Sequence, residues 1–417
     1  MKAIKAYRFE LRPDGTQQRA LSRFAGGLRW VWNQALAEQR RRHSAGLPYA
    51  GYAEMCRWLT AWRNEPATRW LATGPIPPQQ QTLRRVDEAF RRFFARQSGL
   101  PRFKRRGEEP GLRFPSAAHF RLDAANSRIQ CMKLGVMRLR LSRNVEGSLK
   151  NLSITRDGGR WFASLQAEGE FAAEPLGTPP TLGLDLGVAA FAGLSDGRLI
   201  APLQARARQD RKLVRAQRRV SRRQKGTNRR RRAVDRLGAI QRRIARQRRD
   251  WLHKLSTQLV AQHPVLALED LRVKVMSSSP KGSLEAPGRG VRAKAGLNRA
   301  ILDQGWGEFR RQLEYKALWA GGRVFATNPA YTSRLCRICG HEEADNRKRQ
   351  NIFKCVACGH AEYADVNAAK NILAAGHAAW AADDGAPIVR GGKAPLGRPR
   401  KRIPTEARGA ALCTLPP

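Results

Sequence analysis

Several features that mark common protein classes are missing from this 417-residue sequence. No apolar run reaches the ~18 residues that a transmembrane helix needs, so we expect no membrane span. The first residues, 1–5, lack the apolar stretch of a secretory signal, which predicts a protein of the cytosol. A Gly-x-x-x-x-Gly-Lys-Ser/Thr loop is absent, so an NTPase is not supported. No Ser/His/Asp or Cys/His arrangement suggests covalent catalysis either.

Acidic residues are scarce. The chain has 34 Asp and Glu against 79 Lys and Arg, which gives a formal net charge of +45. Such a field disfavours cationic or neutral substrates and attracts polyanions, meaning nucleic acid or an acidic membrane surface. Hydrophobic residues still make up 41% of the chain, which is enough for real cores, and the length allows about two to four domains.

Only seven cysteines are present, and four of them form two pairs. In a reducing cytosol, paired thiols indicate metal ligands rather than disulfides. The spacing C-x2-C-x15-C-x2-C is typical of a four-thiolate zinc site, formed by Cys336, Cys339, Cys355 and Cys358. A Gly and a His follow the second Cys of each pair, so the halves repeat and predict a zinc ribbon. His341 and His360 are alternative ligands, although four cysteines already close a structural site.

The first half of the chain changes from helical to strand periodicity. Residues 5–12 alternate between apolar and charged side chains, which predicts a strand. Helical spacing follows at 21–36, 52–64 and 78–97. From about 113 to 171 the period is two again, and Asp157-Gly158-Gly159 is a hairpin signal. We expect a small β-barrel or sandwich that includes the first strand.

The second half predicts a mixed α/β domain. Apolar strands are expected at 182–189, 265–269 and 322–326, and helices at Ile301–Ala320 and Asp365–Ala375. Two segments rich in small, polar and basic residues predict a mobile loop at 277–296 and a disordered basic tail at 379–417.

Residues 205–249 hold 20 Lys and Arg against two acids. A charge run this dense is compatible with disorder. An apolar stripe that includes Leu237, Ile244 and Leu259 instead favours helices whose basic side follows a nucleic-acid backbone. The arginines and lysine that we expect to contact nucleic acid are Arg215, Arg218, Arg219, Arg222, Arg223, Arg229, Arg230, Arg102 and Lys104.

Three carboxylates occupy positions that call for a partner. Asp185 interrupts an apolar strand and Glu269 ends another, and burying a charge there costs several kcal/mol unless it is exposed, paired or metal-bound. An edge or turn position is the ordinary interpretation of a lone strand Asp. Asp365 opens a helix, where the macrodipole favours an anion. Three acids that converge at the end of a sheet suit Mg²⁺, and two ions ~4 Å apart support phosphodiester cleavage.

Short motifs throughout the chain point to one family. They are Ala6–Pro13, Leu28–Asn33, Leu100–Lys104, Leu184–Val188, Leu268–Leu271, Leu313–Lys316, Tyr331–Ser333, the four cysteines and Asp365–Ile372. Through these motifs, residues 1 to about 375 resemble the TnpB (OrfB) family of transposon-encoded, RNA-guided DNA nucleases. The resemblance implies an α/β multidomain protein with an RNase H-like (RuvC) nuclease domain that carries an inserted zinc ribbon. A β-barrel wedge domain with a helical recognition insertion would precede it.

The resemblance also implies specific assignments. The catalytic, Mg²⁺-binding triad would be Asp185, Glu269 and Asp365, and zinc would be structural. Guide RNA and target DNA would be the partners of a monomeric, nucleoid-associated protein. The predicted boundaries are 1–12 and 113–175 for the wedge domain, 13–112 for the recognition domain, 176–334 for the nuclease domain with a basic helical insertion at 203–260, 335–360 for the ribbon, 361–378 for the last nuclease helix and 379–417 for the tail.

Two positions depart from the family pattern, and several functions stay open. Tyr363 stands where an acid is common, and Arg334 stands where Gln is common. Neither departure removes a triad member, so a nuclease is expected. The alternatives are a compact type V CRISPR effector, a nuclease-dead RNA-guided repressor, a zinc-ribbon binding protein and a strand-joining transposase.

Overall fold

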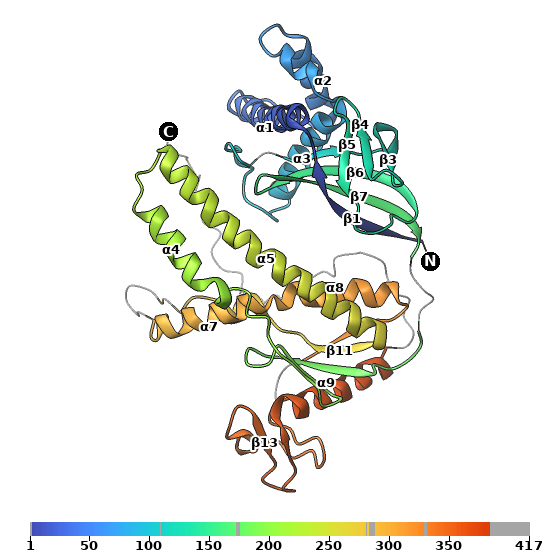
Figure 1. Cartoon of the computed structure of the whole chain (residues 1–417), viewed down its shortest axis with the longest axis vertical. Coiled ribbons are helices and arrows are strands. Elements are labelled where there is room, and N and C mark those ends of the chain that lie inside the picture. The colour runs from blue at the N-terminus through green and yellow to red at the C-terminus, as the bar shows by residue number, and fades with distance from the viewer. Residues whose placement is uncertain are drawn as a thin grey trace, which may run out of the picture.

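The computed structural model describes residues 2–108, 110–171, 176–280, 282, 288–328 and 332–383. Two lobes, each built around its own sheet, lie one above the other, and the long helix α5 (Asn228–Gln262) runs along the space between them (Figure 1). The cysteine-bearing segment projects beyond the second lobe. No helix within the described residues is both long and apolar enough to cross a bilayer.

The first lobe contains a seven-stranded sheet with the order β2-β6-β7-β1-β5-β4-β3. Its pairings are antiparallel, and β1 (Lys2–Arg12) lies between β7 (Arg160–Glu170) and β5 (Gly135–Arg140). The alternation predicted for β1 is confirmed, because Tyr7, Phe9 and Leu11 are buried in the core of the sheet. The other strands are β2 (Leu112–Phe114), β3 (Phe120–Asp123), β4 (Arg128–Cys131) and β6 (Ser148–Asp157).

Three helices pack beside this sheet. They are α1 (Gly15–Ser44), α2 (Tyr52–Asn64) and α3 (Ile76–Phe94), and they share a separate apolar core. Asp14 caps α1 with a capping box, in which its carboxylate accepts from the Gln17 amide at 2.8 Å. The predicted helices therefore form, and α1 is longer than its apolar stripe because arginines continue it to Ser44.

The second lobe contains a five-stranded mixed sheet with the order β10-β9-β8-β11-β12. The strands β8 (Leu182–Leu186), β11 (Leu266–Glu269) and β12 (Val324–Thr327) are parallel. In contrast, β9 (Ala192–Leu194) and β10 (Leu199–Ile200) return antiparallel beside β8. Parallel strands bury both faces, which explains their continuous apolar runs.

Helices cover both faces of this second sheet. The C-terminal part of α5 and α8 (Trp306–Trp319) contribute Leu252, Leu259 and Phe309 to the core on one face. The helix α9 (Ala364–Ala381) lies on the other face, closely enough that a Cβ at Gly183 would stand 2.2 Å from the Ala369 carbonyl. Glycine at this position of β8 thus lets α9 approach the backbone of the sheet.

The basic segment forms an antiparallel pair of helices, α4 (Asp210–Ser221) and α5. Disorder is therefore excluded for the described residues 205–249. The second half of the apolar stripe has its packing partner in α8 and the second sheet, and Leu259 is its most buried member. The predicted insertion at 203–260 is consequently continuous with the core of this lobe.

Three expectations were wrong in detail. The helix predicted at Ile301–Ala320 is two helices, α7 (Val291–Gln304) and α8, because Gly305 has φ 75° and interrupts the helix. The end of the predicted loop 277–296 belongs to α7, whereas residues 281 and 283–287 lie outside the described part. The helix α9 continues to Ala381, past the predicted tail boundary at 379, and the rest of the predicted tail, 384–417, lies outside the described residues.

Candidate active site and metal centre

Asp185 lies inside the second sheet, on β8 between Leu184 and Leu186. It is paired with Gly193 of the neighbouring β9. A Cβ at Gly193 would stand 2.6 Å from the Asp365 carbonyl oxygen, so only glycine allows the start of α9 to lie here. Gly183 on β8 and Gly193 on β9 thus both let α9 approach the sheet, and Gly193 allows its first turn to lie beside Asp185.

Glu269 and Asp365 complete a buried acidic cluster at this place. Glu269 ends β11, the parallel neighbour of β8, and its side chain is 7% exposed. Thr332 donates from Oγ1 to Glu269 Oε1 at 3.1 Å. Asp365 is in the first turn of α9, as predicted. The structure thus brings together the three carboxylates that the sequence singled out.

The three groups influence each other electrostatically. Burial, and after it the charges of Glu269 and Asp365, raise the pKa of Asp185 to about 8. Burial also raises the pKa of Glu269 to about 7, with a contribution from Asp365. The pKa of Asp365 is raised mainly by burial and lowered by Arg347. Three carboxylates that share a buried site, in which their charged forms are disfavoured, favour a bound cation.

Arg347 is a member of this site that sequence reasoning missed. It ends the short turn η4 (Ala344–Arg347) between the cysteine pairs and donates from Nη2 to Asp365 Oδ1 at 3.1 Å. Its charge lowers the pKa of all three carboxylates. Nothing in the sequence separates it from the neighbouring Lys348 and Arg349, since the contact depends on how the loop folds back.

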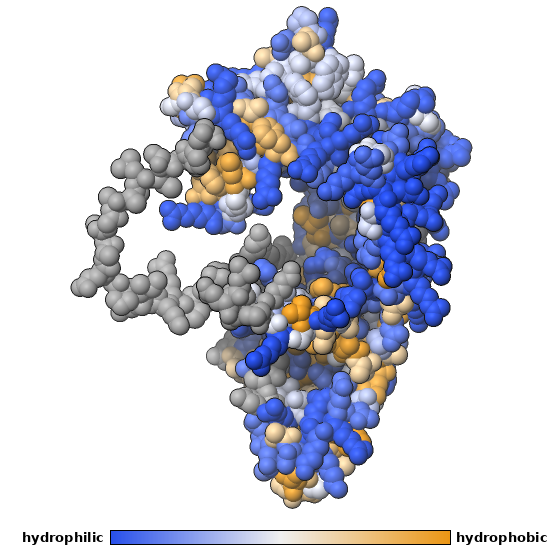
Figure 2. All heavy atoms as spheres, turned by 90° about the vertical axis from the view of Figure 1, so that its left-hand side faces the viewer, coloured by the Kyte–Doolittle hydropathy of each residue, from blue (hydrophilic) through white to orange (hydrophobic). Residues whose placement is uncertain are grey.

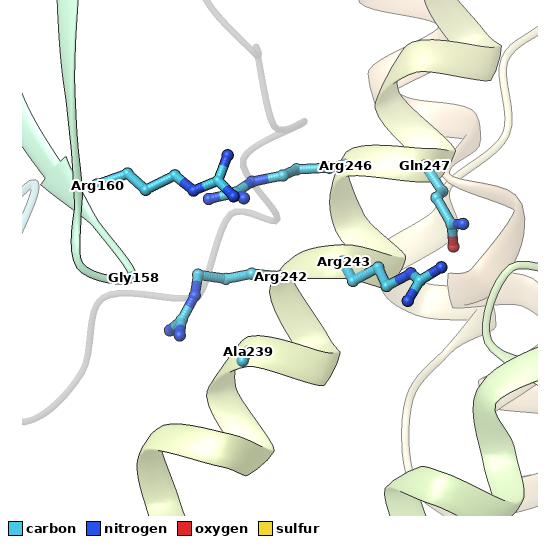
Figure 3. A pocket seen from close by; sticks show the side chains of 7 residues that line it. All are labelled: Gly158, Arg160, Ala239, Arg242, Arg243, Arg246 and Gln247. Carbon is cyan, nitrogen blue, oxygen red and sulfur yellow. The ribbon is translucent and has the colours of Figure 1, made fainter. Parts of the chain in front are cut away.

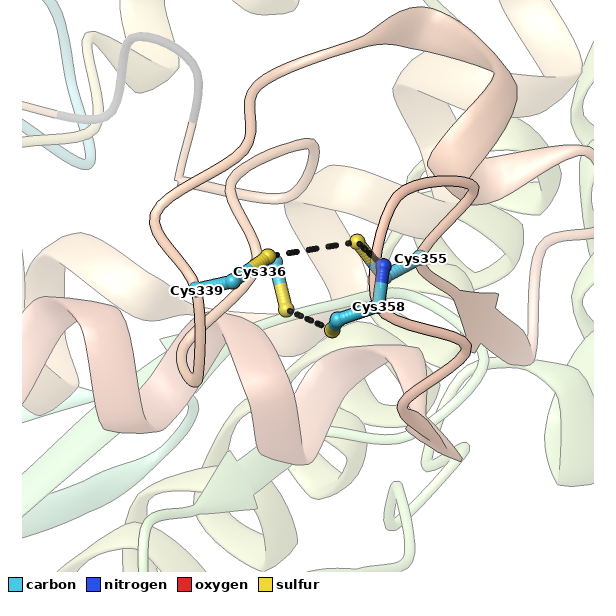
Figure 4. A group of neighbouring side chains, drawn as sticks. All are labelled: Cys336, Cys339, Cys355 and Cys358. Carbon is cyan, nitrogen blue, oxygen red and sulfur yellow. Dashed lines mark hydrogen bonds between the residues drawn. The ribbon is translucent and has the colours of Figure 1, made fainter.

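The four cysteine sulfurs form a compact tetrad (Figure 4). The distance between Cys336 Sγ and Cys358 Sγ is 3.7 Å, and that between Cys339 Sγ and Cys355 Sγ is 3.5 Å. Sulfurs at the corners of a tetrahedron with ~2.3 Å metal bonds are about 3.8 Å apart, so the tetrad fits zinc. The Cys358 amide donates to Cys355 Sγ and lowers the pKa of that thiol to about 6, toward the thiolate that zinc needs.

The sequence repeat of the two cysteine pairs is also a structural repeat. The Cys336 amide donates to the His341 carbonyl at 2.9 Å, and the Cys355 amide donates to the His360 carbonyl at 2.8 Å. The rings of His341 and His360 instead contact Glu343 and Glu362 through Nε2. The histidine alternative is thus wrong for this arrangement, in which the sulfurs alone converge.

The cysteine segment is attached to the acidic cluster through α9. Asn367 donates from Nδ2 to the Leu335 carbonyl at 2.8 Å and accepts from the Arg337 amide at 3.2 Å. Asn371 donates to the carbonyls of Thr332 and Leu335. These buried amides hold the loop that carries Arg347 and Thr332 against the helix that carries Asp365.

The predicted nucleic-acid contacts lie on exposed surfaces. Among the described residues, no carboxylate pairs with the seven arginines that the sequence selected between 215 and 230, and six of them are exposed. Figure 2 views the molecule from the side on which α4 ends and α5 begins, and hydrophilic residues cover much of this face. Arg102 is exposed, whereas Lys104 lies over the Trp32 ring at 4.4 Å.

Three family models match the chain. They are "Probable transposase" at residues 172–279, "Cas12f1-like, TNB domain" at 306–372 and "Helix-turn-helix domain" at 1–47. The regions 172–279 and 306–372 together contain the second sheet and the cysteine tetrad. In the described part of 1–47, the structure has a strand and one long helix instead of two helices joined by a turn.

Relatives match over most of the chain. The chain is 44% identical to "Putative RNA-guided DNA endonuclease InsQ" of Escherichia coli (strain K12), over 97% of this chain and 98% of that protein. It is 32% identical to "Putative RNA-guided DNA endonuclease" of Streptomyces pristinaespiralis, over 92% of each chain. The sheet, the tetrad and the matched models define a transposon-type nucleic-acid protein with a Cas12f1-like C-terminal module. The chain belongs to the TnpB (OrfB) family of insertion-sequence proteins, as its motifs predicted.

A solved structure shares the fold. The protein chain in "Cryo-EM structure of the Cas12f1-sgRNA-target DNA complex" matches with a TM-score of 0.54 at 13% identity, over 86% of this chain and 83% of that one. A likeness at this identity concerns the fold alone. It shows that the two chains share their overall fold over most of their lengths.

Proposed function

We propose that this protein is an RNA-guided DNA endonuclease that hydrolyses target DNA at the acidic cluster of Asp185, Glu269 and Asp365. The observation that carries the proposal is this cluster, in which burial raises the pKa of all three carboxylates and repulsion between the acids raises the pKa of Asp185 and Glu269 further. Buried carboxylates with raised pKa values do not stabilise the fold by themselves, and such groups cluster at functional sites. A positively charged ligand would stabilise their ionised forms.

The second sheet is assigned to the RNase H-like (RuvC) class. Three antiparallel strands, β10, β9 and β8, are followed by the parallel strands β11 and β12, and helices cover both faces. The acids lie on the two central strands and on the helix that packs against them. This arrangement supports the assignment because the parallel strands β8 and β11 bring Asp185 and Glu269 to the same carboxyl end of the sheet, the end at which open α/β sheets bind ligands.

Asp185, Glu269 and Asp365 would hold Mg²⁺ through carboxylate oxygens, the donors that this ion prefers. Bound there, Mg²⁺ would stabilise the attacking and leaving oxygens of the phosphodiester. Thr332 fixes one Glu269 oxygen by a hydrogen bond, which leaves the other free to act as a ligand. Arg347 donates to Asp365 and lowers the pKa of that carboxyl, which opposes the effect of burial and favours the ionised form that a metal needs.

The four cysteines would hold one structural zinc ion. The tetrad fits tetrahedral coordination, and a small segment whose own core is a cluster of four buried residues gains stability from such a metal. Zinc would therefore order the loop from which Arg347 reaches Asp365.

Guide RNA and target DNA would be the partners of the two lobes. The unpaired arginines of α4 and α5 support phosphate contacts that do not depend on sequence, so that base pairing with the guide selects the target. We retain the predicted wedge, recognition and nuclease domains, with the seven-stranded sheet as the wedge, and a monomeric state.

A compact CRISPR effector is the second candidate, which the Cas12f1 likeness favours. Relatives that match over almost their full length favour the transposon-encoded protein.

A cleavage assay tests the proposal. RNA that co-purifies with the protein would be sequenced, and duplex DNA matching its guide portion, with a randomised flank, would be incubated with the complex. We expect cleavage in Mg²⁺ and none in EDTA. A complex that binds the RNA but leaves every matched duplex intact would contradict the nuclease proposal and favour an RNA-guided repressor.

A further inference from the structure

A cavity of about 380 Å³ lies where the two lobes meet, and its walls are basic. The hairpin of β6 and β7 contributes Gly158 and Arg160, and α5 contributes Ala239, Arg242, Arg243, Arg246 and Gln247 (Figure 3). None of these residues belongs to the nucleic-acid contacts that the sequence predicted. Four guanidinium groups lie in this lining, so the cavity suits an anion and disfavours a cation.

The arginines of the two walls face each other. Figure 3 shows the side chains of Arg160 and Arg246 pointing toward one another across the cavity, and Arg242 extending toward the hairpin. Like charges repel at such close range, so this geometry is favourable when an anion lies between them. Free guanidinium groups in a fixed fork match the oxygens of a phosphate.

Protein carboxylates compensate only part of this charge. Asp157 is shared among Arg8, Arg242 and Arg246, at 3.8, 4.0 and 3.3 Å. Arg160 contacts Glu10 at 3.3 Å. Within the described residues, Arg243 has no ion pair, so five arginines are balanced by two carboxylates. The surplus positive charge remains available to a ligand.

Two features hold the cavity open and in place. The Phe162 ring lies under the guanidinium groups of Arg8 and Arg246, with Cζ at 4.1 and 5.7 Å from its centroid. The hairpin turns through Gly158 and Gly159, both with positive φ, and a Cβ at Gly158 would overlap Arg242. A turn without side chains therefore leaves room for Arg242 of α5 to lie against the hairpin.

We propose that this cavity binds backbone phosphates of the guide RNA, and that the RNA thereby bridges the hairpin of the first lobe and α5 of the second. This inference rests on the proposed function, since it assumes an RNA partner. Target DNA carries the same phosphate chemistry, but a site at the junction of the lobes suits the nucleic acid that is bound first and stays bound. RNA binding would then also stabilise the relative position of the lobes.

The test uses the variant Arg160→Gln/Arg242→Gln, which keeps the contacts of Arg8 and Arg246 with Asp157. Its matched control is Arg57→Gln/Arg198→Gln, which removes the same charge from exposed arginines in local ion pairs away from the cavity. Affinity for the co-purifying RNA, made by transcription, is measured from 50 to 400 mM salt. The zinc content and melting temperature of each free variant establish that it folds.

We expect the cavity variant to bind RNA on the order of tenfold more weakly at ~0.15 M salt, with a salt slope lower by about 1.4, which is two single-strand phosphate contacts. RNA should raise its melting temperature less than that of wild type, and the control should match wild type in both. Equal affinity and slope for cavity variant and control would overturn the inference. If only the affinity of the RNA-loaded protein for matched duplex DNA falls, the phosphates belong to DNA and the RNA assignment is overturned. The nuclease proposal is judged separately, by whether wild type cleaves that duplex in Mg²⁺.

Discussion

Two sets of metal-ligand side chains adjoin α9, and they differ in how the fold prepares them. The cysteine sulfurs already lie 3.5–3.7 Å apart within each cross-pair, and repeated amide hydrogen bonds hold their loops. The carboxylates are instead held in a buried site that raises their pKa values. The tetrad thus contributes to folding when it binds metal, whereas the acidic cluster has an electrostatic cost that a cation relieves.

The difference teaches where each metal acts. Metal ligands that come from one short segment can be predicted from their spacing in the sequence, and the metal that they bind stabilises that segment. Ligands that come from two strands and a helix need the whole lobe, and their metal can act on a substrate. Arg347 links the sets, because it belongs to the cysteine loop and contacts Asp365.

Replacing an acid should have the largest effect. We expect Asp185→Ala and Asp365→Ala to slow DNA cleavage on the order of a thousandfold, because losing a ligand misplaces the charge that stabilises the transition state. RNA affinity should stay within about twofold of wild type, since it depends on the exposed arginines. Cleavage rates and RNA binding are measured on the same preparations. A variant that cuts at the wild-type rate would remove that acid from the site.

Replacing a ligand of the tetrad should act through stability. Cys336→Ser is expected to lose its zinc and to cut at least about tenfold more slowly, because the loop that carries Arg347 is no longer ordered. Metal analysis and cleavage rates check this. Cys56→Ser, at a half-buried cysteine outside the tetrad, is the control and should keep both. Full activity in a zinc-free Cys336→Ser protein would show that the two sets are independent.

Replacing Arg347 tests the link between the sets. Arg347→Ala should slow cleavage about 10- to 100-fold, as is usual for a partner of a metal ligand. Its charge lowers the pKa of all three acids, so its loss should move the rising limb of the pH–rate profile to higher pH. Lys348→Ala, at the exposed neighbouring residue, should leave the profile unchanged. If Arg347→Ala instead cleaves faster than wild type and reaches half its maximal rate at a lower Mg²⁺ concentration, Arg347 blocks the site.

The attachment of the cysteine loop should have a smaller effect. Asn367→Ala removes two hydrogen bonds between α9 and the loop, at a cost of about 1–3 kcal/mol in the stability of that contact. We expect a several-fold loss of cleavage with full zinc content. Lys370→Ala, which removes only an ion pair with Glu362 of β14 (Ala361–Tyr363) and leaves the hydrogen bonds to residues 335–337 in place, is the control. Loss of zinc in Asn367→Ala would show that the tetrad itself depends on α9.

The smallest effect should appear in metal-free stability. Asp185 has a folded pKa of about 8 against an ordinary 3.8, so the fold favours its protonated form and loses stability as pH rises between these values. In EDTA, Asp185→Asn should melt with wild type near pH 4 and at a higher temperature than wild type near pH 8, by about 2–4 °C for each kcal/mol of stability that ionisation of Asp185 costs. Mg²⁺ should raise the melting temperature of wild type alone. Parallel melting curves from pH 4 to 8 would contradict the raised pKa.

Local patterns predicted the elements well, because their causes are local. The alternation of Tyr7, Phe9 and Leu11 and the repeated cysteine spacing are properties of a few neighbouring residues, and both are confirmed. The meeting of Asp185, Glu269 and Asp365 was predictable because parallel strands end at one edge of a sheet.

Features that depend on tertiary contacts were not predictable. The break at Gly305 divides a continuous apolar pattern, and only the φ of 75° shows that the chain turns there. The contact of Arg347 with Asp365 and the facing arginines of the cavity join residues from segments far apart in sequence. Among 79 basic residues, sequence alone could not select these few.

The most direct test of metal-dependent hydrolysis at the acidic cluster is a metal-rescue measurement. Target DNA with a single phosphorothioate at the mapped cleavage position would be cut by the RNA-loaded wild type in Mg²⁺ and in Mn²⁺. One sulfur diastereomer should be cut far more slowly in Mg²⁺ and be restored by the more thiophilic Mn²⁺, because a metal contacts that phosphate oxygen. Asp185→Ala should cut neither. Equal rates for oxygen and sulfur substrates in Mg²⁺, or cleavage by Asp185→Ala, would contradict the assignment of this cluster as the active site.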